Sequence, residues 1–217
     1  MKKKELFLRY FVLIIGLLFS AFGVALSKQA ELGVTPISSV ANVMSYKFTS
    51  LSMGSWLIIW NCTLIAGQII LLRKKFRLIQ LLQIPLSFLF GWFTDLGLWC
   101  VSAIPSDIYM LRLAMVFAGI IVLALGISLS VAAGVIMNSG EAFVKAVSDV
   151  SGKNFGNVKI VFDIGCVLTS VLLSLLFFNM KIIGTREGTV ISAVFTGIAV
   201  KLFNKRIGGK VRNFLTK

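Results

Sequence analysis

Six long apolar runs constrain this sequence more than any other feature. A transmembrane helix needs about 20 mostly apolar residues, and each run is close to that length. The composition agrees, because only 14% of the residues are charged, whereas a soluble domain carries about 25%. We therefore expect an all-α polytopic membrane protein with six transmembrane helices. The expected spans are Tyr10–Leu26, Leu51–Leu72, Leu78–Val101, Leu113–Met137, Ile160–Phe178 and Gly188–Phe203.

The basic residues predict how these spans are oriented. Lys and Arg collect in the cytoplasmic loops of membrane proteins, and the net charge of +14 is spread unevenly along the chain. With the N-terminus in the cytoplasm, few basic residues fall outside, namely Lys28, Lys47, Arg112, Lys181 and Arg186. We therefore expect a multi-pass protein of a bacterial plasma membrane with both termini cytoplasmic. Such a charge could also suit nucleic acid, but the apolar runs do not, so we expect no nucleic-acid partner.

The two halves of the chain resemble each other at a shift of 103 residues. GLLFSAFGVALSKQA (Gly16–Ala30) matches GIIVLALGISLSVAA (Gly119–Ala133), with small residues in register. After a one-residue gap Asn61 matches Asp163, and LSFLFG loosely matches SAVFTG. Three spans in each half place the second half upside down relative to the first, as in many secondary transporters. Chance similarity between two apolar helices is the alternative. The expected repeats of this single membrane domain are residues 1–104 and 105–217.

A short polar segment follows the first span of each half. In VTPIS, Thr35 is a good N-cap and Pro36 suits a first helical turn. In NSGEAF, Asn138 can cap a helix while Glu141 completes a capping box. Each segment therefore predicts a helix of about ten residues, too short to cross the ~30 Å hydrocarbon core. These helices either re-enter the membrane from opposite faces and build a central polar site, or lie on its surface as amphipathic helices.

Four motifs resemble a family of membrane proteins. GVTPISSV, MNSGEAF, VKIVFDIGCV and IGTREGTVISAVFTG together are similar to the YczE/YyaS/YitT group of small bacterial integral membrane proteins, over nearly the whole chain. The resemblance implies a transporter-like fold with no settled substrate. That group often has acidic or Trp residues just after the first proline, whereas Ile37, Ser38 and Ser39 follow Pro36 here. No ligand contact of the family is carried over to that point.

Ionisable and amide side chains inside the spans are candidates for a solute or ion pathway. Asp163 can share a helix face with Lys159, so a salt bridge competes with a paired site formed with Asn61. In GTREGT, a simple turn competes with a broken-helix entry where Arg186 meets an anionic group. The candidate pathway residues are Thr35, Pro36, Asn61, Asn138, Ser139, Glu141, Asp163, Arg186 and Glu187.

Three further polar side chains favour structural roles. Asp95 lies between Trp92 and Trp99, and Trp prefers the membrane interface. A position at the outer interface is therefore favoured for Asp95 over a role in a pathway. Gln80 and Gln83 in the third span are expected to hydrogen-bond neighbouring helices.

The residues that are missing argue against an enzyme. The chain has no His, the commonest metal ligand and general base. Its three cysteines, Cys62, Cys100 and Cys166, lie inside apolar runs without metal-site spacing and predict packed thiols. No nucleotide-binding loop, Ser/Lys pair or paired-Asp motif is present. We expect no catalytic residues, no bound metal and no cofactor.

Two functions fit these observations. The first is a secondary transporter or exporter of a small solute, coupled to protons through Glu141 or Asp163, because a carboxylate in a low-dielectric site titrates nearer neutrality. The second is a membrane accessory or substrate-binding subunit of a larger transport complex. A channel would need a continuous polar stripe, which cannot be traced. The expected partners are the lipid bilayer, an unknown small solute and, in a homo-oligomer, further copies of the chain.

Overall fold

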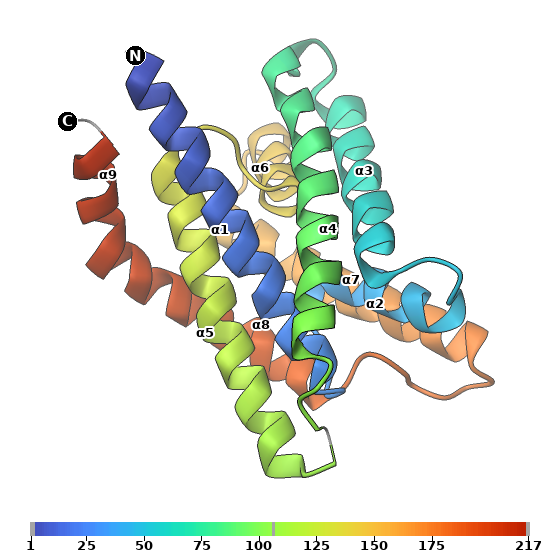
Figure 1. Cartoon of the computed structure of the whole chain (residues 1–217). Coiled ribbons are helices and arrows are strands. Elements are labelled where there is room, and N and C mark those ends of the chain that lie inside the picture. The colour runs from blue at the N-terminus through green and yellow to red at the C-terminus, as the bar shows by residue number, and fades with distance from the viewer. Residues whose placement is uncertain (1–2, 106, 216–217) are drawn as a thin grey trace.

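The computed structural model describes residues 3–105 and 107–215, and its regular elements are helices joined by short loops (Figure 1). Two 3₁₀ turns, η1 (Arg73–Lys75) and η2 (Leu78–Leu82), and a π-helical turn, η3 (Asn204–Gly208), adjoin the α-helices. The α-helices are α1 (Lys3–Gln29), α2 (Pro36–Lys47), α3 (Met53–Leu72), α4 (Gln83–Val101), α5 (Tyr109–Ala133), α6 (Ser139–Ser151), α7 (Phe155–Phe177), α8 (Glu187–Phe203) and α9 (Gly209–Leu215).

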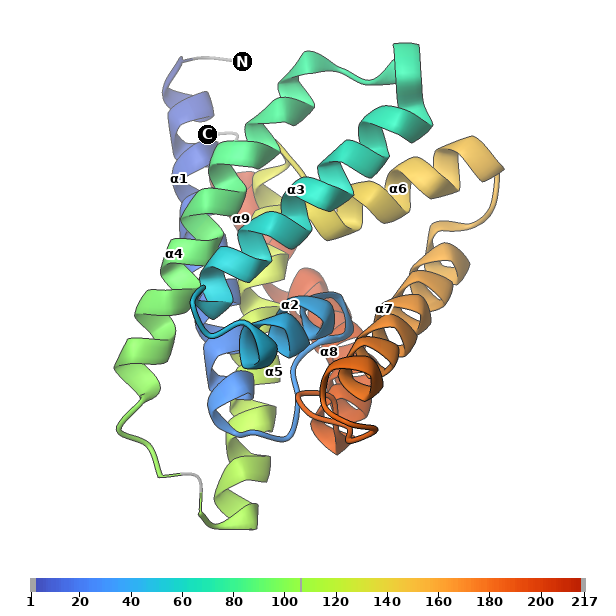
Figure 2. The same ribbon diagram turned by 90° about the vertical axis from the view of Figure 1, so that its right-hand side faces the viewer.

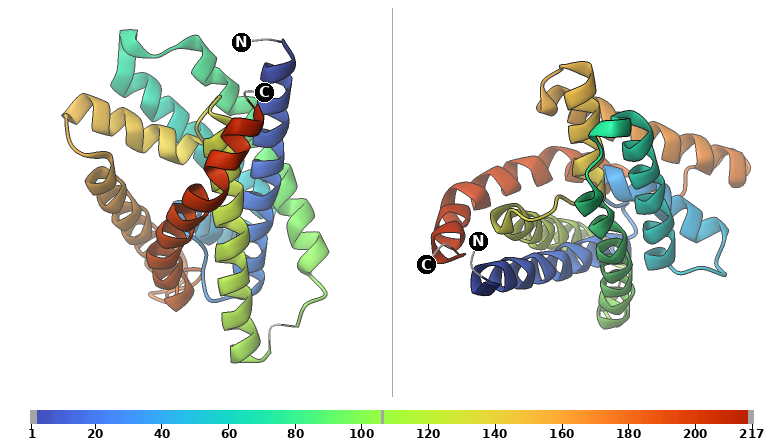
Figure 3. Two further views of the ribbon diagram at one scale, coloured as in Figure 1. Left: turned by 90° about the vertical axis from the view of Figure 1, so that its left-hand side faces the viewer. Right: turned by 90° about the horizontal axis from the view of Figure 1, so that it is seen from above.

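In the described part of the chain, five helices are long and apolar enough to cross a membrane: α1, α3, α4, α5 and α7, with η1 extending α3 and η2 extending α4. This confirms the all-α architecture and fits a multi-pass membrane protein. The sixth expected span forms α8, which has only 17 residues and continues through η3 into α9 (Figure 3).

The fourth expected span is wrong at its end. The helix α5 stops at Ala133 instead of continuing to Met137, because Gly134 adopts a left-handed conformation (φ 64°) that terminates it. The residues up to Asn138 form a loop.

The most extensive helix packing joins α1 and α5, which run in opposite directions (Figure 1). Glycines let the two backbones touch. A Cβ built on Gly16 would lie 2.8 Å from the Gly126 carbonyl oxygen, and one on Gly119 would lie 2.8 Å from that of Gly23. The reverse contacts, Gly126 to Gly16 and Gly23 to Gly119, would be 2.5 Å and 2.6 Å. A side chain larger than hydrogen at these glycines would therefore clash with backbone atoms.

The remaining contacts fall into matching pairs. Helix α1 packs on α4 as α5 packs on α8, and α2 packs on α7 as α6 packs on α3. Similarly, α2 contacts α3 and α6 contacts α7. Each short helix therefore lies against both α3 and α7.

The two polar segments do form short helices, as predicted. Figure 2 shows α2 and α6 beside α3 and α7, with α2 lying across the direction of α1 and α5. Most of α2 is buried, including Ser38, Ser39 and Asn42, and α6 buries a face that includes Ser139 and Val144. The two helices meet at their N-termini, where a Cβ on Gly140 would lie 2.9 Å from the Ile37 side chain.

Candidate site: a cavity at the start of α6

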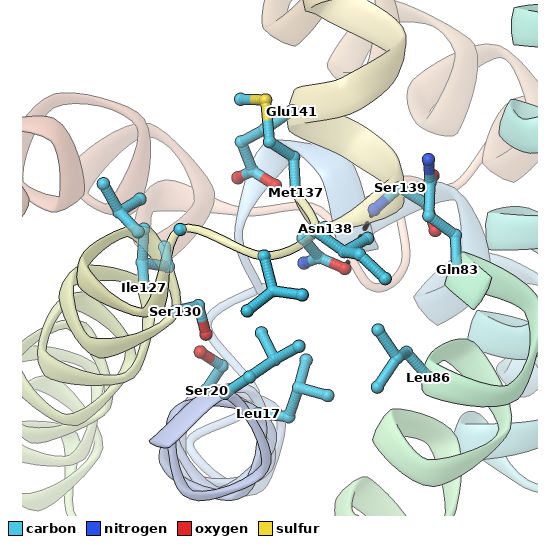
Figure 4. Close-up of a pocket in the computed structure, with 15 residues that line it drawn as sticks. Leu17, Ser20, Gln83, Leu86, Ile127, Ser130, Met137, Asn138, Ser139 and Glu141 are labelled. Atoms are coloured by element: carbon cyan, nitrogen blue, oxygen red, sulfur yellow. Dashed lines mark hydrogen bonds between the residues drawn. The ribbon is translucent and has the colours of Figure 1, made fainter. Parts of the chain in front are cut away.

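A cavity of about 290 Å³ lies between the two halves of the chain. Its walls come from α1 and α4 of the first half and from α5, the following loop and the start of α6 of the second half (Figure 4). Most of the wall is aliphatic: Leu13, Leu17, Leu86, Ile127, Val131, Val135, Ile136 and Met137. The polar lining residues are Ser20, Gln83, Ser130, Asn138, Ser139 and Glu141.

The start of α6 is built differently from the predicted capping box. Asn138 is the N-cap, and its Oδ1 accepts a hydrogen bond of 3.0 Å from the backbone N–H of Ser139. Glu141 does not return to the N-cap to complete the box; its side chain borders the cavity (Figure 4). The reason is that the Val135–Met137 loop leads the chain into α6 beside the cavity, so the first turn of α6 faces the open volume.

Glu141 is the one acidic side chain among the cavity's lining residues. Part of the side chain faces the cavity, but Oε2 is shielded from solvent and has no hydrogen-bond partner within the described residues. Burial raises the pKa of the Glu141 carboxyl. The positive charge of Lys159 and a hydrogen bond from the Glu141 backbone N–H oppose this rise, and the negative charge of Asp163 adds to it. The carboxyl group therefore keeps one acceptor oxygen without a partner, which a proton can occupy.

Buried amides fix the position of α6 against α3 and α4. Gln68 and Gln83 exchange two hydrogen bonds of 3.1 Å through their side chains. Gln68 Nε2 also donates to the Ser139 carbonyl at 3.3 Å, and the hydroxyls of Ser139 and Ser87 lie 3.2 Å apart. Gln83 thus bonds a neighbouring helix as expected, and it also lines the cavity. Gln80 instead accepts a hydrogen bond from the backbone N–H of Arg77.

The corresponding region of the first half is closed. A shift of 103 residues places Leu32, Gly33 and Val34 opposite the Val135–Met137 loop, and all three are buried, whereas Met137 is 44% exposed. Gly33 forms an isolated antiparallel bridge with Thr185, and the Gly188 N–H donates to the Leu32 carbonyl at 2.8 Å. These bonds join the loop before α2 to the start of α8.

Two hydroxyls without hydrogen-bond partners lie on α8, the helix that this closed loop contacts. Thr189 and Ser192 on α8 are fully buried, and neither hydroxyl has a hydrogen-bond partner within the part of the chain that the structure describes. Burying a hydroxyl without a hydrogen bond costs free energy. No hydrogen bond within the described residues offsets that cost at Thr189 or Ser192. The loose match of LSFLFG to SAVFTG places Ser192 opposite the cavity residue Leu86.

Three of the candidate pathway residues line the cavity: Asn138, Ser139 and Glu141. Thr35 is the N-cap residue of α2, but its hydroxyl donates to Ser38 Oγ instead of capping the backbone, and Pro36 begins α2. Both lie outside the cavity.

The other four candidates have separate surroundings. Asn61 is buried in α3, and its Nδ2 has no partner in the described residues. Both carboxylate oxygens of Asp163 lie 2.5 Å from Lys159 Nζ, so the salt bridge predicted as the alternative is present. Arg186 and Glu187 form an exposed ion pair of 3.3 Å in the turn before α8. Asn61 and Asp163 are matched in the sequence repeat, but neither residue lines the cavity.

Asp95 holds two helices together. Its carboxylate accepts hydrogen bonds from Ser52 Oγ at 2.6 Å and from the Gly54 N–H at 2.8 Å, at the N-terminus of α3. This is a capping contact from one helix to another, and it agrees with the structural role favoured for Asp95.

Sequence reasoning missed Ser20 and Ser130, which lie side by side at the α1–α5 end of the cavity (Figure 4). The Ser130 hydroxyl is buried without a hydrogen-bond partner in the described chain. The repeat carried a usable signal, because Ser130 is one of its identical positions, matched to Ser27. The Ser27 hydroxyl instead bonds the Gly23 carbonyl of its own helix.

The arrangement can bind a small, mainly apolar molecule with one polar end. No group of three His, Cys, Asp or Glu side chains that could hold a metal ion occurs in residues 3–105 and 107–215. All three cysteines are free.

Comparison with known proteins identifies a family but no activity. No curated protein and no solved structure gives a significant match. Residues 7–205 match the Family of unknown function (DUF6198), and because this range takes in both halves and every residue lining the cavity, the chain belongs to that family.

Proposed function

We propose that this protein is a secondary transporter of a small solute in a bacterial plasma membrane. The observation that carries the proposal is the cavity between the two halves, which is open beside α6 and has a closed counterpart beside α2. Alternating access requires a site that two repeats can expose in turn. The relation to the YczE/YyaS/YitT group, with its transporter-like fold, is part of this proposal.

The proposal includes an inverted repeat of six membrane helices, with α8 as the sixth. The glycine contacts support it, because exchanging each residue of α1 with the one 103 positions later turns the Gly16–Gly126 contact into the Gly119–Gly23 contact. Ile37 and Gly140, the contact between the short helices, also differ by 103 and exchange with each other. A two-fold axis through these contacts would relate residues 1–104 to residues 105–217.

The short helices are proposed to re-enter the membrane instead of lying on its surface. Their burial against α3 and α7 supports this, because irregular backbone at membrane depth needs protein or water around it. With both termini cytoplasmic, as the basic residues predict, the cavity faces the cytoplasm and the closed Leu32–Val34 loop faces outward.

Glu141 supplies the proposed coupling to protons. A carboxyl group in a largely apolar cavity can bind a proton in one state and release it in another when its surroundings change. Asp163 is the weaker candidate, because Lys159 already neutralises it.

Cysteine labelling tests whether the two regions open in turn. In a background with Cys62, Cys100 and Cys166 replaced by alanine, Ser130→Cys and Ser192→Cys report on the cavity and on its closed counterpart. We expect a membrane-impermeant thiol reagent to label Ser130→Cys in inside-out vesicles and Ser192→Cys, more slowly, in intact cells. Thr94→Cys is the matched control, because Thr94 is fully buried in α4 away from both regions.

Each outcome separates the two functions. Labelling at both sites, with Thr94→Cys unreactive, supports alternating access. If Ser130→Cys is labelled while Ser192→Cys stays unreactive from both sides, the cavity opens to one side only. That result would refute transport by this chain alone and favour a substrate-binding subunit of a larger complex.

A further inference from the structure

We propose that the cavity at the start of α6 selects small amphiphilic amines, held as ammonium ions by the Glu141 carboxylate. This inference rests on the proposed function, since it names the class of solute that the same site would carry.

The wall of the cavity sets the apolar part of the ligand. Eight of its lining side chains are aliphatic, and no aromatic side chain is among the lining residues. Removing apolar surface from water contributes roughly 25 cal/mol per Å², so a hydrocarbon body gains more here than a polar one. A sugar or a zwitterion would leave many hydrogen-bonding groups facing Leu and Val side chains without partners, which is costly.

Glu141 sets the charge of the ligand. Among the fifteen lining residues it is the only charged one. The nearby basic groups are already neutralised: Lys159 by Asp163, and Arg9, on the turn of α1 before Leu13, by Glu5 at 3.0 Å. Arg9 also donates to the Ala133 carbonyl at 2.9 Å. The unbalanced charge of the site is therefore negative, and a cation is the complement.

The hydrogen-bonding pattern favours an amine with N–H groups. Glu141 Oε2 and the Ser130 hydroxyl are buried without a hydrogen-bond partner in the described residues, and a small movement of either side chain toward the cavity would present an acceptor to a ligand. A protonated amine donates up to three hydrogen bonds and carries the matching charge. An alcohol could occupy the same volume but would not neutralise the carboxylate, and a carboxylate ligand would be repelled by it.

Three rigid probes of the same shape test this selectivity: 1-aminoadamantane, 1-adamantanol and adamantane-1-carboxylate. Each is titrated by calorimetry into the protein in lipid nanodiscs, with empty nanodiscs correcting for partition into lipid. We expect saturable binding of the amine, with the alcohol weaker and the carboxylate not bound. Because this comparison uses the unsubstituted protein, it does not depend on any variant folding.

Substitution then locates the site. Glu141→Gln keeps the shape but removes the charge, and it should weaken amine binding about 10- to 100-fold, the worth of a hydrogen bond to a charged group. Asp149→Asn is the matched control: Asp149 is a carboxylate of the same helix, but it pairs with Lys145 at 2.6 Å and lies outside this cavity. Amine affinity should be unchanged in Asp149→Asn.

Equal amine affinity in Glu141→Gln and the unsubstituted protein would overturn the inference, and so would preference for the alcohol or the carboxylate. The labelling experiment on Ser192→Cys is independent of these results. Selective amine binding without labelling would leave the ligand class standing and refute transport. Labelling at both sites without amine selectivity would support transport and refute the ligand class.

Discussion

The regions around α6 and α2 occupy matching places in the two halves, yet one is open and the other is closed. The loop before α6 is partly exposed and borders a cavity of about 290 Å³. The loop before α2 is buried and bonded to the start of α8 through the Gly33–Thr185 bridge and the Leu32–Gly188 hydrogen bond. Similar sequence patterns therefore support two different packings. This is what two repeats need if each can adopt either arrangement in turn.

The chemistry of the two regions also differs. Next to the open loop, Glu141 brings a carboxylate without a hydrogen-bond partner on Oε2. The position matched to Glu141 is Ser38, a buried hydroxyl that accepts a hydrogen bond from Thr35. On the closed side Lys28 is half-buried and donates to Asn42 and Ser45 at 3.0 Å and 2.7 Å. A carboxylate therefore borders the open loop, whereas the matched position beside α2 carries no charge.

The largest effect on folding is expected where α1 of the first half crosses α5 of the second half. Gly126→Val places methyl groups against the Gly16 carbonyl oxygen and neighbouring backbone of α1, and overpacking against backbone cannot be relieved by a rotamer change. We expect no monodisperse protein in size-exclusion chromatography. The symmetric substitution Gly23→Val should be equally damaging.

The matched control for the crossing is Gly197→Ala, because a Cβ at Gly197 meets no atom within 4 Å. In a helix this change stabilises by about 1 kcal/mol or less. Normal folding of Gly126→Val would show that the close approach of α1 and α5 is not required.

The closed region can be opened by crowding its contact with α8. A Cβ on Gly188 would lie 2.7 Å from the Leu32 carbonyl oxygen, so Gly188→Val should push the loop away and break their hydrogen bond. Overpacking of 1–3 kcal/mol shifts a two-state equilibrium about 5- to 150-fold. The labelling rate of Ser192→Cys should rise by that factor, whereas Gly197→Val on the same helix should leave it unchanged. An unchanged rate in Gly188→Val would mean that the Leu32–Gly188 contact does not hold the region shut.

The open region should bind its ligand in a pH-dependent way. Burial raises the pKa of Glu141, so its carboxyl becomes protonated at a higher pH than a free glutamate. Only the ionised form attracts an ammonium ion. Affinity for 1-aminoadamantane should therefore be greatest above the pKa and fall about tenfold per pH unit below it.

The groups near Glu141 do not supply an alternative explanation for such a profile. On α7, Lys159 and Asp163 neutralise each other, on α1 Arg9 is paired with Glu5, and α3 has no acidic or basic residue. Calorimetry at a series of pH values measures the profile, and Glu141→Gln should flatten it. A profile that persists in Glu141→Gln would assign the titration to another group.

The smallest expected effect concerns the amides that anchor α6. Gln68→Leu leaves the Gln83 side chain and the Ser139 carbonyl without this partner, which should lower the free energy of unfolding by about 1–2 kcal/mol. The double variant Gln68→Leu/Gln83→Leu should recover part of the loss, because no buried amide then remains unpaired. Thermal unfolding in nanodiscs measures both. A double variant as unstable as the sum of the two single variants would argue against coupling between these amides.

The sequence by itself determined the helical class, the apolar helices and the positions of both short helices. Those features follow from local patterns: runs of apolar residues near 20 in length, and Thr35–Pro36 and Asn138 as helix starts. The repeat also showed small residues in register, and the structure places four of these glycines at the α1–α5 crossing. It missed the end of α5, where Gly134 overrides an apolar run that continues to Met137.

Only the tertiary structure decided which polar residues share a site. Sequence matching placed Asp163 with Asn61, whereas in the structure Asp163 forms a salt bridge with Lys159. Glu141 instead lines a cavity together with Ser20 and Ser130. The closed state of the Leu32–Val34 loop was equally invisible, because its partners, Thr185 before α8 and Gly188 on α8, lie more than 150 residues away in the chain. Local patterns fix where a helix starts, but the direction a side chain faces depends on which distant helices pack around it.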